Sequence, residues 1–367
     1  MKFICDRSIL LKEIAIAQEI ISSKNVISIL SNIYLEAKDD TLFIKATDIK
    51  VNFETKLPVL VKDDGCCTVY GDKFLGILNS IPEGELEFEQ NDAKITIKTT
   101  IKKIKFQLKS IASDKFPEFP VPKDENTFEV PIKEFKEMIK QTVFAVSDDE
   151  TRYFMNGVFF EKQENKLNMV ATDGRRLAFI SKEAGQEVND FTGIIVPPKI
   201  LNIIMKRAGD EGPISLSVTD KILFITFGSY HLSSVLIEGD FPNYRRVIPE
   251  SQSHSFTVSR LEMLDALKRV SLLVEQKSRR VYLGLAPGVL SVSSEESEIG
   301  AAREEIPCRY DGEEVSIALN YRYVEEPFKE MSEEEIEIFF TEPNKAITIK
   351  PVPEGDFFHI VMPMQLE

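Results

Sequence analysis

The chain has 367 residues, 43% hydrophobic and 29% charged, a composition that excludes a disordered or fibrous protein and fits two or three globular domains. Its 45 Lys and Arg against 60 Asp and Glu give a net charge of −15, which argues against nucleic acid binding unless positive charge gathers on one surface. Charged residues interrupt the apolar positions of residues 1–21, and no apolar run is long enough to span a membrane. We therefore expect neither a signal peptide nor a spanning helix, and a cytoplasmic location.

Three passages of about 122 residues repeat one order of predicted elements, in which a helix leads three strands and a second helix leads three more. The first passage predicts a helix at 8–23, strands at 32–38, 41–46 and 51–57, a helix at 72–80, and strands at 85–89, 94–99 and 103–108. The second predicts a helix at 131–146, strands at 157–161, 166–171 and 176–181, a helix at 198–208, and strands at 214–218, 222–227 and 231–236. The third predicts a helix at 259–275, strands at 281–285, 289–293 and 300–306, a helix at 320–331, and strands at 335–340, 346–350 and 357–362.

The first two passages end in similar strings, Asp114-Lys115-Phe116-Pro117 and Asp240-Phe241-Pro242. A polar linker rich in Pro or Ser follows each string, as expected between domains. A turn shared by both boundaries indicates duplication of one unit. The sequence therefore predicts an α+β protein of three similar domains, at residues 1–122, 123–252 and 253–367.

Lysines recur on the predicted helices, opposite the apolar stripe. Lys133, Lys136 and Lys140 are three and four residues apart on the first helix of the second passage, and Lys199 and Lys206 are seven apart on its second helix. A solvated helix face explains this pattern on any single helix. Its recurrence in a chain with a net charge of −15 favours a gathered positive surface instead.

The sequence contains no phosphate-binding glycine loop, dinucleotide-binding fingerprint, nucleophile elbow or zinc-protease motif. Its four cysteines and three histidines lack metal-site spacing, so we expect no metal and no cofactor. Asp148 and Asp149 form an acidic group, and Asp173 opens an Asp-Gly turn followed by two arginines. That turn is either a plain connection between strands or part of a binding pocket. A hydrolase that uses Asp148, Asp149 and Asp173 therefore stays open as an alternative.

Four strings carry a resemblance to a known family: 152–157 (RYFMNG), 171–178 (ATDGRRLA), 241–249 (FPNYRRVIP) and 361–366 (VMPMQL). With the threefold pattern, they make the whole chain resemble the bacterial DNA polymerase III beta subunits, the sliding clamps. The resemblance implies three DNA-clamp domains, each with two helices lining a central hole and antiparallel sheets outside, in a head-to-tail dimeric ring. Lysines facing phosphates would then hold duplex DNA without reading its sequence.

The resemblance also implies three sets of site residues. The set for a hydrophobic peptide-binding cleft is Met155, Thr172, Gly174, Arg175, Leu177, Pro242, Arg246, Val247, Asn320, Tyr323, Ile360, Met362, Pro363, Met364 and Gln365. The set for the DNA channel is Lys24, Lys73, Lys136, Arg152, Tyr153, Lys199 and Lys206. The set for the dimer interface is Phe106 and Leu108 on a strand and Leu272 and Leu273 on a helix.

The resemblance implies that the protein is a non-catalytic processivity factor. Its partners would be double-stranded DNA, a second copy, the DNA polymerase III alpha subunit, the clamp loader, and other polymerases and repair proteins with clamp-binding peptides, with no membrane partner. Arg175 stands where many family members have histidine, and Gln365 where arginine is common, so the preference among peptides stays open. The other alternative is a repeat scaffold that binds protein partners only, and the lysine-bearing helices argue against it.

Overall fold

The structure is a computed structural model that describes residues 1–21, 28–122, 127–185, 188–189 and 191–365. The chain divides into two compact units: unit 1 contains Met1–Ile132 and Asn202–Leu236, and unit 2 contains Lys133–Leu201 and Ile237–Glu367. The division cuts the second passage, because some of its strands pair with the first passage and the others pair with the third. No helix of the described residues is long and apolar enough to cross a lipid bilayer.

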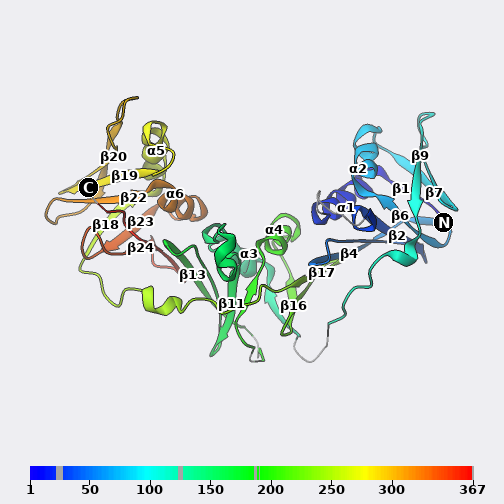
Figure 1. The fold of residues 1–367 in the computed structure, drawn as a ribbon, viewed down its shortest axis with the longest axis horizontal. Coiled ribbons are helices and arrows are strands. Elements are labelled where there is room, and N and C mark those ends of the chain that lie inside the picture. The colour runs from blue at the N-terminus through cyan, green and yellow to red at the C-terminus, as the bar shows by residue number, and fades with distance from the viewer. Residues whose placement is uncertain (22–27, 123–126, 186–187, 190, 366–367) are drawn as a thin grey trace. The chain divides into compact units, whose positions relative to one another are not determined.

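Unit 1 is built on one antiparallel sheet, and α1 (Arg7–Ile20) and α2 (Gly71–Ser80) lie side by side against it (Figure 1). The sheet has the order β10-β15-β16-β17-β4-β3-β2-β6-β9-β8-β7-β1-β5. Its strands are β1 (Lys2–Asp6), β2 (Asn32–Lys38), β3 (Thr41–Thr47), β4 (Val51–Pro58), β5 (Leu60–Asp63), β6 (Gly65–Tyr70), β7 (Glu85–Asn91), β8 (Lys94–Thr99), β9 (Lys105–Ile111), β10 (Thr127–Pro131), β15 (Pro213–Val218), β16 (Ile222–Phe227) and β17 (Tyr230–Val235).

Unit 2 is built on a second antiparallel sheet, with α3 (Ile132–Lys140), α5 (Arg260–Val270) and α6 (Tyr321–Glu330); α4 (Pro198–Arg207) crosses the division. The sheet has the order β14-β11-β12-β13-β25-β24-β23-β18-β21-β20-β19-β22. Its strands are β11 (Val158–Gln163), β12 (Lys166–Thr172), β13 (Arg176–Glu183), β14 (Ile194–Val196), β18 (His254–Ser259), β19 (Arg280–Ala286), β20 (Val289–Ser294), β21 (Arg303–Arg309), β22 (Val315–Asn320), β23 (Glu335–Phe340), β24 (Ile347–Val352) and β25 (Phe357–Val361).

Strands that the sequence prediction missed come directly before several helices. β1, β18 and β22 end at Asp6, Ser259 and Asn320, and each of these side chains caps the helix that follows. The Asp6 carboxylate accepts two backbone N–H groups at 2.8 and 3.1 Å, which satisfies donors that a helix start leaves open. In each case the last residue of the strand is also the capping residue of the helix. The short strand pattern therefore could not be distinguished from the start of the helix in the sequence.

Two predicted helices end earlier than expected. α3 stops at Lys140 instead of residue 146, where the Thr142 hydroxyl donates to the carbonyl of Met138 at 2.7 Å and a short 3-10 segment follows. α5 stops at Val270, and η7 (Ser271–Leu273) is a 3-10 turn. Side-chain bonding to the preceding turn and β-branched residues both weaken a continuing helix.

The buried faces of the helices follow helical spacing but do not include every apolar residue. Met263, Ala266, Leu267 and Val270 form the buried face of α5, with spacings of three, four and seven. Leu261 falls outside that face and is 62% exposed. On α1, Ile9 is likewise exposed, whereas the charged Glu13 is buried.

Candidate functional site

The turn between β12 and β13 is the centre of the candidate peptide site in unit 2. The Thr172 hydroxyl donates to the carbonyl of Arg176 at 2.6 Å and accepts the N–H of Gly174 at 3.1 Å. Gly174 has a φ of +86°, and a Cβ there would lie 2.8 Å from the guanidinium of Arg152. The turn therefore needs glycine at this position, and Arg152 lies directly against it.

Arg176, which our sequence prediction did not include, ties this turn to α6. Its guanidinium donates to Asp173 at 3.0 Å, to the carbonyl of Phe144 at 2.7 Å and to the carboxylate of Glu326. It also stacks on the ring of Tyr323, with 4.6 Å to the ring centroid. A planar guanidinium can serve these partners together, whereas a lysine offers only a point charge. Arg176 therefore holds Tyr323, one of the predicted cleft residues, in place.

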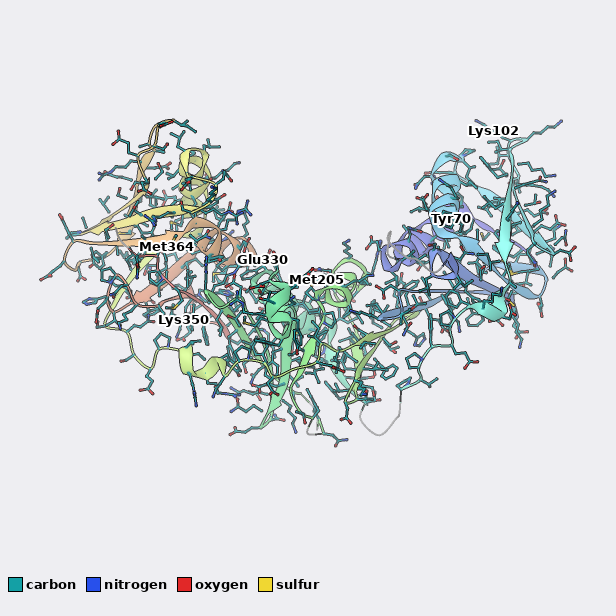
Figure 2. The ribbon with its side chains drawn as sticks, viewed as in Figure 1. Tyr70, Lys102, Met205, Glu330, Lys350 and Met364 are labelled. Carbon is teal, nitrogen blue, oxygen red and sulfur yellow. The ribbon has the colours of Figure 1, made fainter. Side chains whose placement is uncertain are left out.

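Beyond β25 the tail is held by two backbone hydrogen bonds. The N–H of Met362 donates to the carbonyl of Arg175 at 2.9 Å, and the N–H of Met364 donates to the carbonyl of Ala318 at 2.8 Å (Met364 is labelled in Figure 2). The predicted strand to residue 362 is one residue too long, and the tail itself is not a strand. Pro363, which has no N–H, interrupts the ladder.

A buried apolar cluster underlies the turn and the tail. Leu177 and Ile360 face each other across β13 and β25, and Val170 and Tyr244 complete the cluster. The Tyr244 hydroxyl donates to Glu161 at 2.6 Å. Burial, and next this hydrogen bond to a carboxylate, raises the pKa of Tyr244, so the phenol stays a donor.

The predicted cleft residues all lie in unit 2, but their exposure differs. The exposed ones are Gly174, Arg175, Arg246, Val247, Met362 and Gln365. The half-buried ones are Pro242, Asn320, Tyr323, Pro363 and Met364. The buried ones are Met155, Thr172, Leu177 and Ile360. At 3% exposure, Leu177 packs beneath the surface instead of offering an open apolar face, whereas Val247 is 52% exposed.

The predicted DNA-channel residues fall on different kinds of element. Lys73 lies on α2, Lys136 on α3, and Lys199 and Lys206 on α4. Arg152 and Tyr153 lie on the 3-10 segment η5 (Glu150–Met155), and Lys24 lies outside the described residues.

Positive charge gathers on the α-helices. The six α-helices of the described chain carry fourteen Lys and Arg against ten Asp and Glu. The whole chain has a net charge of −15, so the remainder carries a large negative excess. The helices therefore carry a net positive charge that suits phosphate contact.

The predicted interface residues have unequal exposure. Phe106 and Leu108 on β9 are half-buried, Leu272 on η7 is 80% exposed and Leu273 is half-buried. The sequence prediction did not include Ile299, which is 86% exposed near Leu273.

Two charged segments accompany these apolar side chains. The β8–β9 hairpin, residues 94–109, contains six lysines and no acidic residue, and Lys102 projects from its tip (Figure 2). Ile101, also absent from the prediction, lies beside that tip and is 68% exposed. Residues 295–305 in unit 2 contain five glutamates and one arginine. In the sequence, the signal for these surfaces is an isoleucine within a block of residues of one charge, as at Ile101 and Ile299.

Two of the three acidic residues of the hydrolase alternative, Asp149 and Asp173, have structural roles. Asp149 accepts the N–H of Thr151 at 3.0 Å and binds Arg152 at 2.9 Å. Hydrogen bonds from Thr151, and next from Arg152, hold the pKa of Asp149 below its usual range. Asp173 is bound to Arg176, and the described residues contain no cluster of three potential metal ligands.

Comparison with known proteins matches three family models along the chain. They are the N-terminal, central and C-terminal domains of the DNA polymerase III beta subunit, at residues 1–120, 129–243 and 245–365. The beta sliding clamp of Treponema pallidum is 47% identical over the full length of both chains. The chain belongs to the DNA polymerase III beta subunit family.

Other clamps agree with this assignment. The beta sliding clamp of Caulobacter vibrioides is 30% identical over the full length of both chains. Two crystal structures are similar to this chain over the full length of both chains compared: the clamp from Bacillus subtilis, and the clamp from Pseudomonas aeruginosa bound to griselimycin. Each has a TM-score of 0.93 and 25% sequence identity to this chain. The predicted clamp fold is therefore confirmed.

Family membership settles the competing hypotheses. This clamp is a non-catalytic processivity factor of DNA polymerase III, so the hydrolase alternative is wrong. It binds duplex DNA, the polymerase and other clamp-binding proteins, so the hypothesis of a scaffold for protein partners alone is also wrong.

Proposed function

We propose that two copies of this clamp close head to tail into a ring around duplex DNA, and that the α-helices face the phosphates. The observation that carries this proposal is the excess of Lys and Arg on six α-helices of a strongly acidic chain. Contacts to phosphates alone hold DNA without reading base edges, so the ring can slide. The acidic remainder repels DNA and favours its position in the hole.

The same proposal divides each chain into domains at 1–122, 123–252 and 253–367. The three family-model matches, at 1–120, 129–243 and 245–365, support these boundaries. We propose Lys24, Lys73, Lys136, Lys199 and Lys206 as phosphate contacts, with Arg152 and Tyr153 at their edge. A processivity factor must meet the bacterial chromosome, so we also propose a cytoplasmic location.

Retention on closed circular DNA tests the ring. Clamps loaded on a circular duplex should elute with it, and cutting the duplex should release them, since a topological link ends with the circle. Replacing Lys136, Lys199 and Lys206 together by Glu should reduce loading and retention, whereas Lys350→Glu on β24 should not. Release at equal rates from circular and cut DNA would refute encirclement.

We propose that the β8–β9 hairpin of one chain meets residues 295–305 and η7 of the other. The lysine-rich hairpin and the glutamate-rich segment have opposite charge, and exposed apolar side chains accompany both. Opposite charges orient two surfaces during encounter, and buried apolar area stabilises the complex. Phe106, Leu108, Leu272 and Leu273 would form the apolar centre of each interface.

We propose that the turn, η6 (Tyr244–Val247), the start of α6 and the tail form the cleft for clamp-binding peptides. Exposed Val247 and Met362 and half-buried Tyr323 and Met364 offer adaptable apolar surface. Arg175, Arg246 and Gln365 add polar groups at its edge. Partners that share the cleft would compete for it, so a clamp-binding peptide should displace the polymerase alpha subunit.

A further inference from the structure

Several cations on the helix faces already have carboxylate partners. On α4, the ammonium of Lys206 lies 3.1 Å from one oxygen of Glu19, and the guanidinium of Arg207 lies 3.3 Å from the other. Glu19 comes from α1, so one carboxylate bridges two helices and holds two cations.

Single ion pairs between a cation and a carboxylate occur on other helices and on η5. The side chains are well exposed in several of these pairs: Lys73 and Asp72 are 67% and 65% exposed, and Arg152 and Asp149 are 45% and 39% exposed. The pairs are Lys73 with Asp72 at 3.3 Å, Arg152 with Asp149 at 2.9 Å, Lys140 with Glu330 at 4.0 Å, and Lys329 with Glu325 at 2.8 Å.

A phosphate that approaches such a cation has to replace a carboxylate. Exposed ion pairs change an equilibrium by roughly fivefold at most, so the exchange is nearly balanced. The displaced carboxylate stays nearby and repels the phosphate. Each DNA contact is therefore weaker, and breaks more easily, than a contact to an unpaired lysine would be.

We propose that Glu19, Asp72 and Asp149 act as built-in competitors of the DNA backbone, which keep phosphate contacts weak and exchangeable while the ring slides. This inference rests on the proposed encirclement of DNA by the helices. It assigns a role in DNA binding to acidic residues on the DNA-facing surface. A surface selected only for tight DNA binding would carry positive charge. The presence of these negative side chains therefore needs another explanation.

The test compares Glu19→Gln and the double variant Glu19→Gln with Asp72→Asn against Glu354→Gln. Glu354 is an exposed carboxylate that lies on no helix and pairs with Lys350 at 2.6 Å (Lys350 is labelled in Figure 2). Glu354→Gln changes the net charge of the chain by the same amount as Glu19→Gln. Each variant, as the full-length dimer, is titrated onto a short linear duplex by fluorescence polarisation over a range of salt. Its diffusion is then followed on long DNA after loading by the clamp loader.

Glu19→Gln should tighten duplex binding about two- to fivefold. The salt dependence should steepen by roughly 0.9 in log–log slope for each additional phosphate that the protein neutralises. Diffusion on DNA should slow by a similar factor, and Glu354→Gln should match the parent. An equal increase in affinity in Glu19→Gln and Glu354→Gln would reduce the effect to net charge and overturn the inference.

Lys206→Glu separates this inference from the proposed function. If Lys206→Glu weakens DNA binding but Glu19→Gln leaves it unchanged, the competitor role is wrong and the ring proposal stands. If neither change alters binding or retention, α4 does not face DNA and the proposed channel is wrong. Thermal unfolding and sedimentation of each variant show whether loss of the α1–α4 bridge has changed the fold or the dimer instead.

Discussion

Arg176 shows how much of the proposed peptide site depends on one side chain. Its guanidinium is only 10% exposed and joins the β12–β13 turn, the carbonyl of Phe144 and Glu326 of α6. The resemblance strings indicated the neighbouring Arg175 as a cleft residue. The partners of Arg176 lie 32 and 150 residues away along the chain, so no local pattern predicts its role.

Arg176→Lys should weaken peptide binding about tenfold, because a lysine cannot replace all the hydrogen bonds of the guanidinium and Tyr323 loses its stacking partner. Fluorescence polarisation with a labelled clamp-binding peptide measures the loss. Arg309→Lys, at an exposed arginine outside the proposed cleft, is the control and should retain the affinity. Dimer formation and DNA retention should be normal in both, and full affinity in Arg176→Lys would contradict the positioning role.

His359 makes a second prediction at the scale of one residue. It is completely buried, its Nε2 lies 3.2 Å from Gln141, and its Nδ1 has no partner among the described residues. Burial, and next the charge of Arg176, lowers the pKa of His359 to about 3. In the unfolded chain this histidine binds a proton below a pKa of about 6.5, whereas in the folded chain it stays neutral. The free energy of unfolding therefore falls as pH decreases below about 6.5.

Between about pH 7 and about pH 5.5, the parent should therefore lose about 1 kcal/mol more unfolding free energy than His359→Gln. Urea unfolding at both pH values checks this difference. His231→Gln, at an exposed position, is the control for loss of a histidine elsewhere in the chain. Equal slopes in the parent and His359→Gln would show that His359 is protonated in the folded protein.

At the scale of elements, two strand junctions join neighbouring repeats: β13 with β25 in unit 2, and β4 with β17 in unit 1. The two junctions correspond to each other, but their side chains differ in chemistry. In unit 2, β25 places Ile360 opposite Leu177, and in unit 1, β17 places Ser233 opposite Asn52. The amide of Asn52 donates to the Ser233 hydroxyl at 2.9 Å, so polar groups replace the apolar floor. Both junctions keep aromatic side chains from the Phe-Pro strings, since Phe116 packs near Tyr34 and Phe241 stacks on Phe159.

A hydrophobic clamp-binding peptide should consequently bind once per chain. Isothermal titration of the dimer should give a stoichiometry of two peptides per ring, because an apolar anchor cannot supply hydrogen bonds to the polar floor of unit 1 that it would cover. Four peptides per ring would mean that the unit 1 junction also accepts them.

Deleting residues 362–367 should abolish that binding, since the tail contributes Met362 and Met364 to the cleft. A peptide leucine buried there gains about 1.5–3 kcal/mol, a large share of a micromolar affinity near 8 kcal/mol. Deleting only residues 366–367 is the control and should leave the affinity near that of the parent. Sedimentation should show a dimer in both, and retained binding in the longer deletion would exclude the tail from the cleft.

Helices and alternating strands were predictable because their periods of 3.6 and two residues leave a clear trace in the sequence. The strands at β1, β18 and β22 were missed because each ends in the capping residue of the following helix. The last predicted strand ran to residue 362, whereas the tail beyond β25 is held by separate bonds to Arg175 and Ala318. Such contacts between distant elements are decided by tertiary packing, which a local pattern does not contain.

At the scale of the whole molecule, the proposed ring would use surfaces that are exposed in one chain. Leu272→Ala with Leu273→Ala should weaken the dimer, because truncating a leucine buried at the interface costs about 2–5 kcal/mol. Sedimentation at low protein concentration should then show monomers. Leu261→Ala, a comparably exposed leucine on α5, is the control and should stay dimeric. An unchanged dimer in the double variant would exclude η7 from the interface.

The pairing of β17 with β4, and of β25 with β13, also determines how a loaded clamp would respond to mechanical force. Each junction between repeats is a ladder of backbone hydrogen bonds within one chain, whereas the proposed interface brings together surfaces of two separate chains. A ladder pulled along its strands must break several bonds together, but an interface can yield one contact at a time. When a moving polymerase pulls on the ring, the chain–chain interfaces should therefore open first, and each chain should come away intact and able to close again.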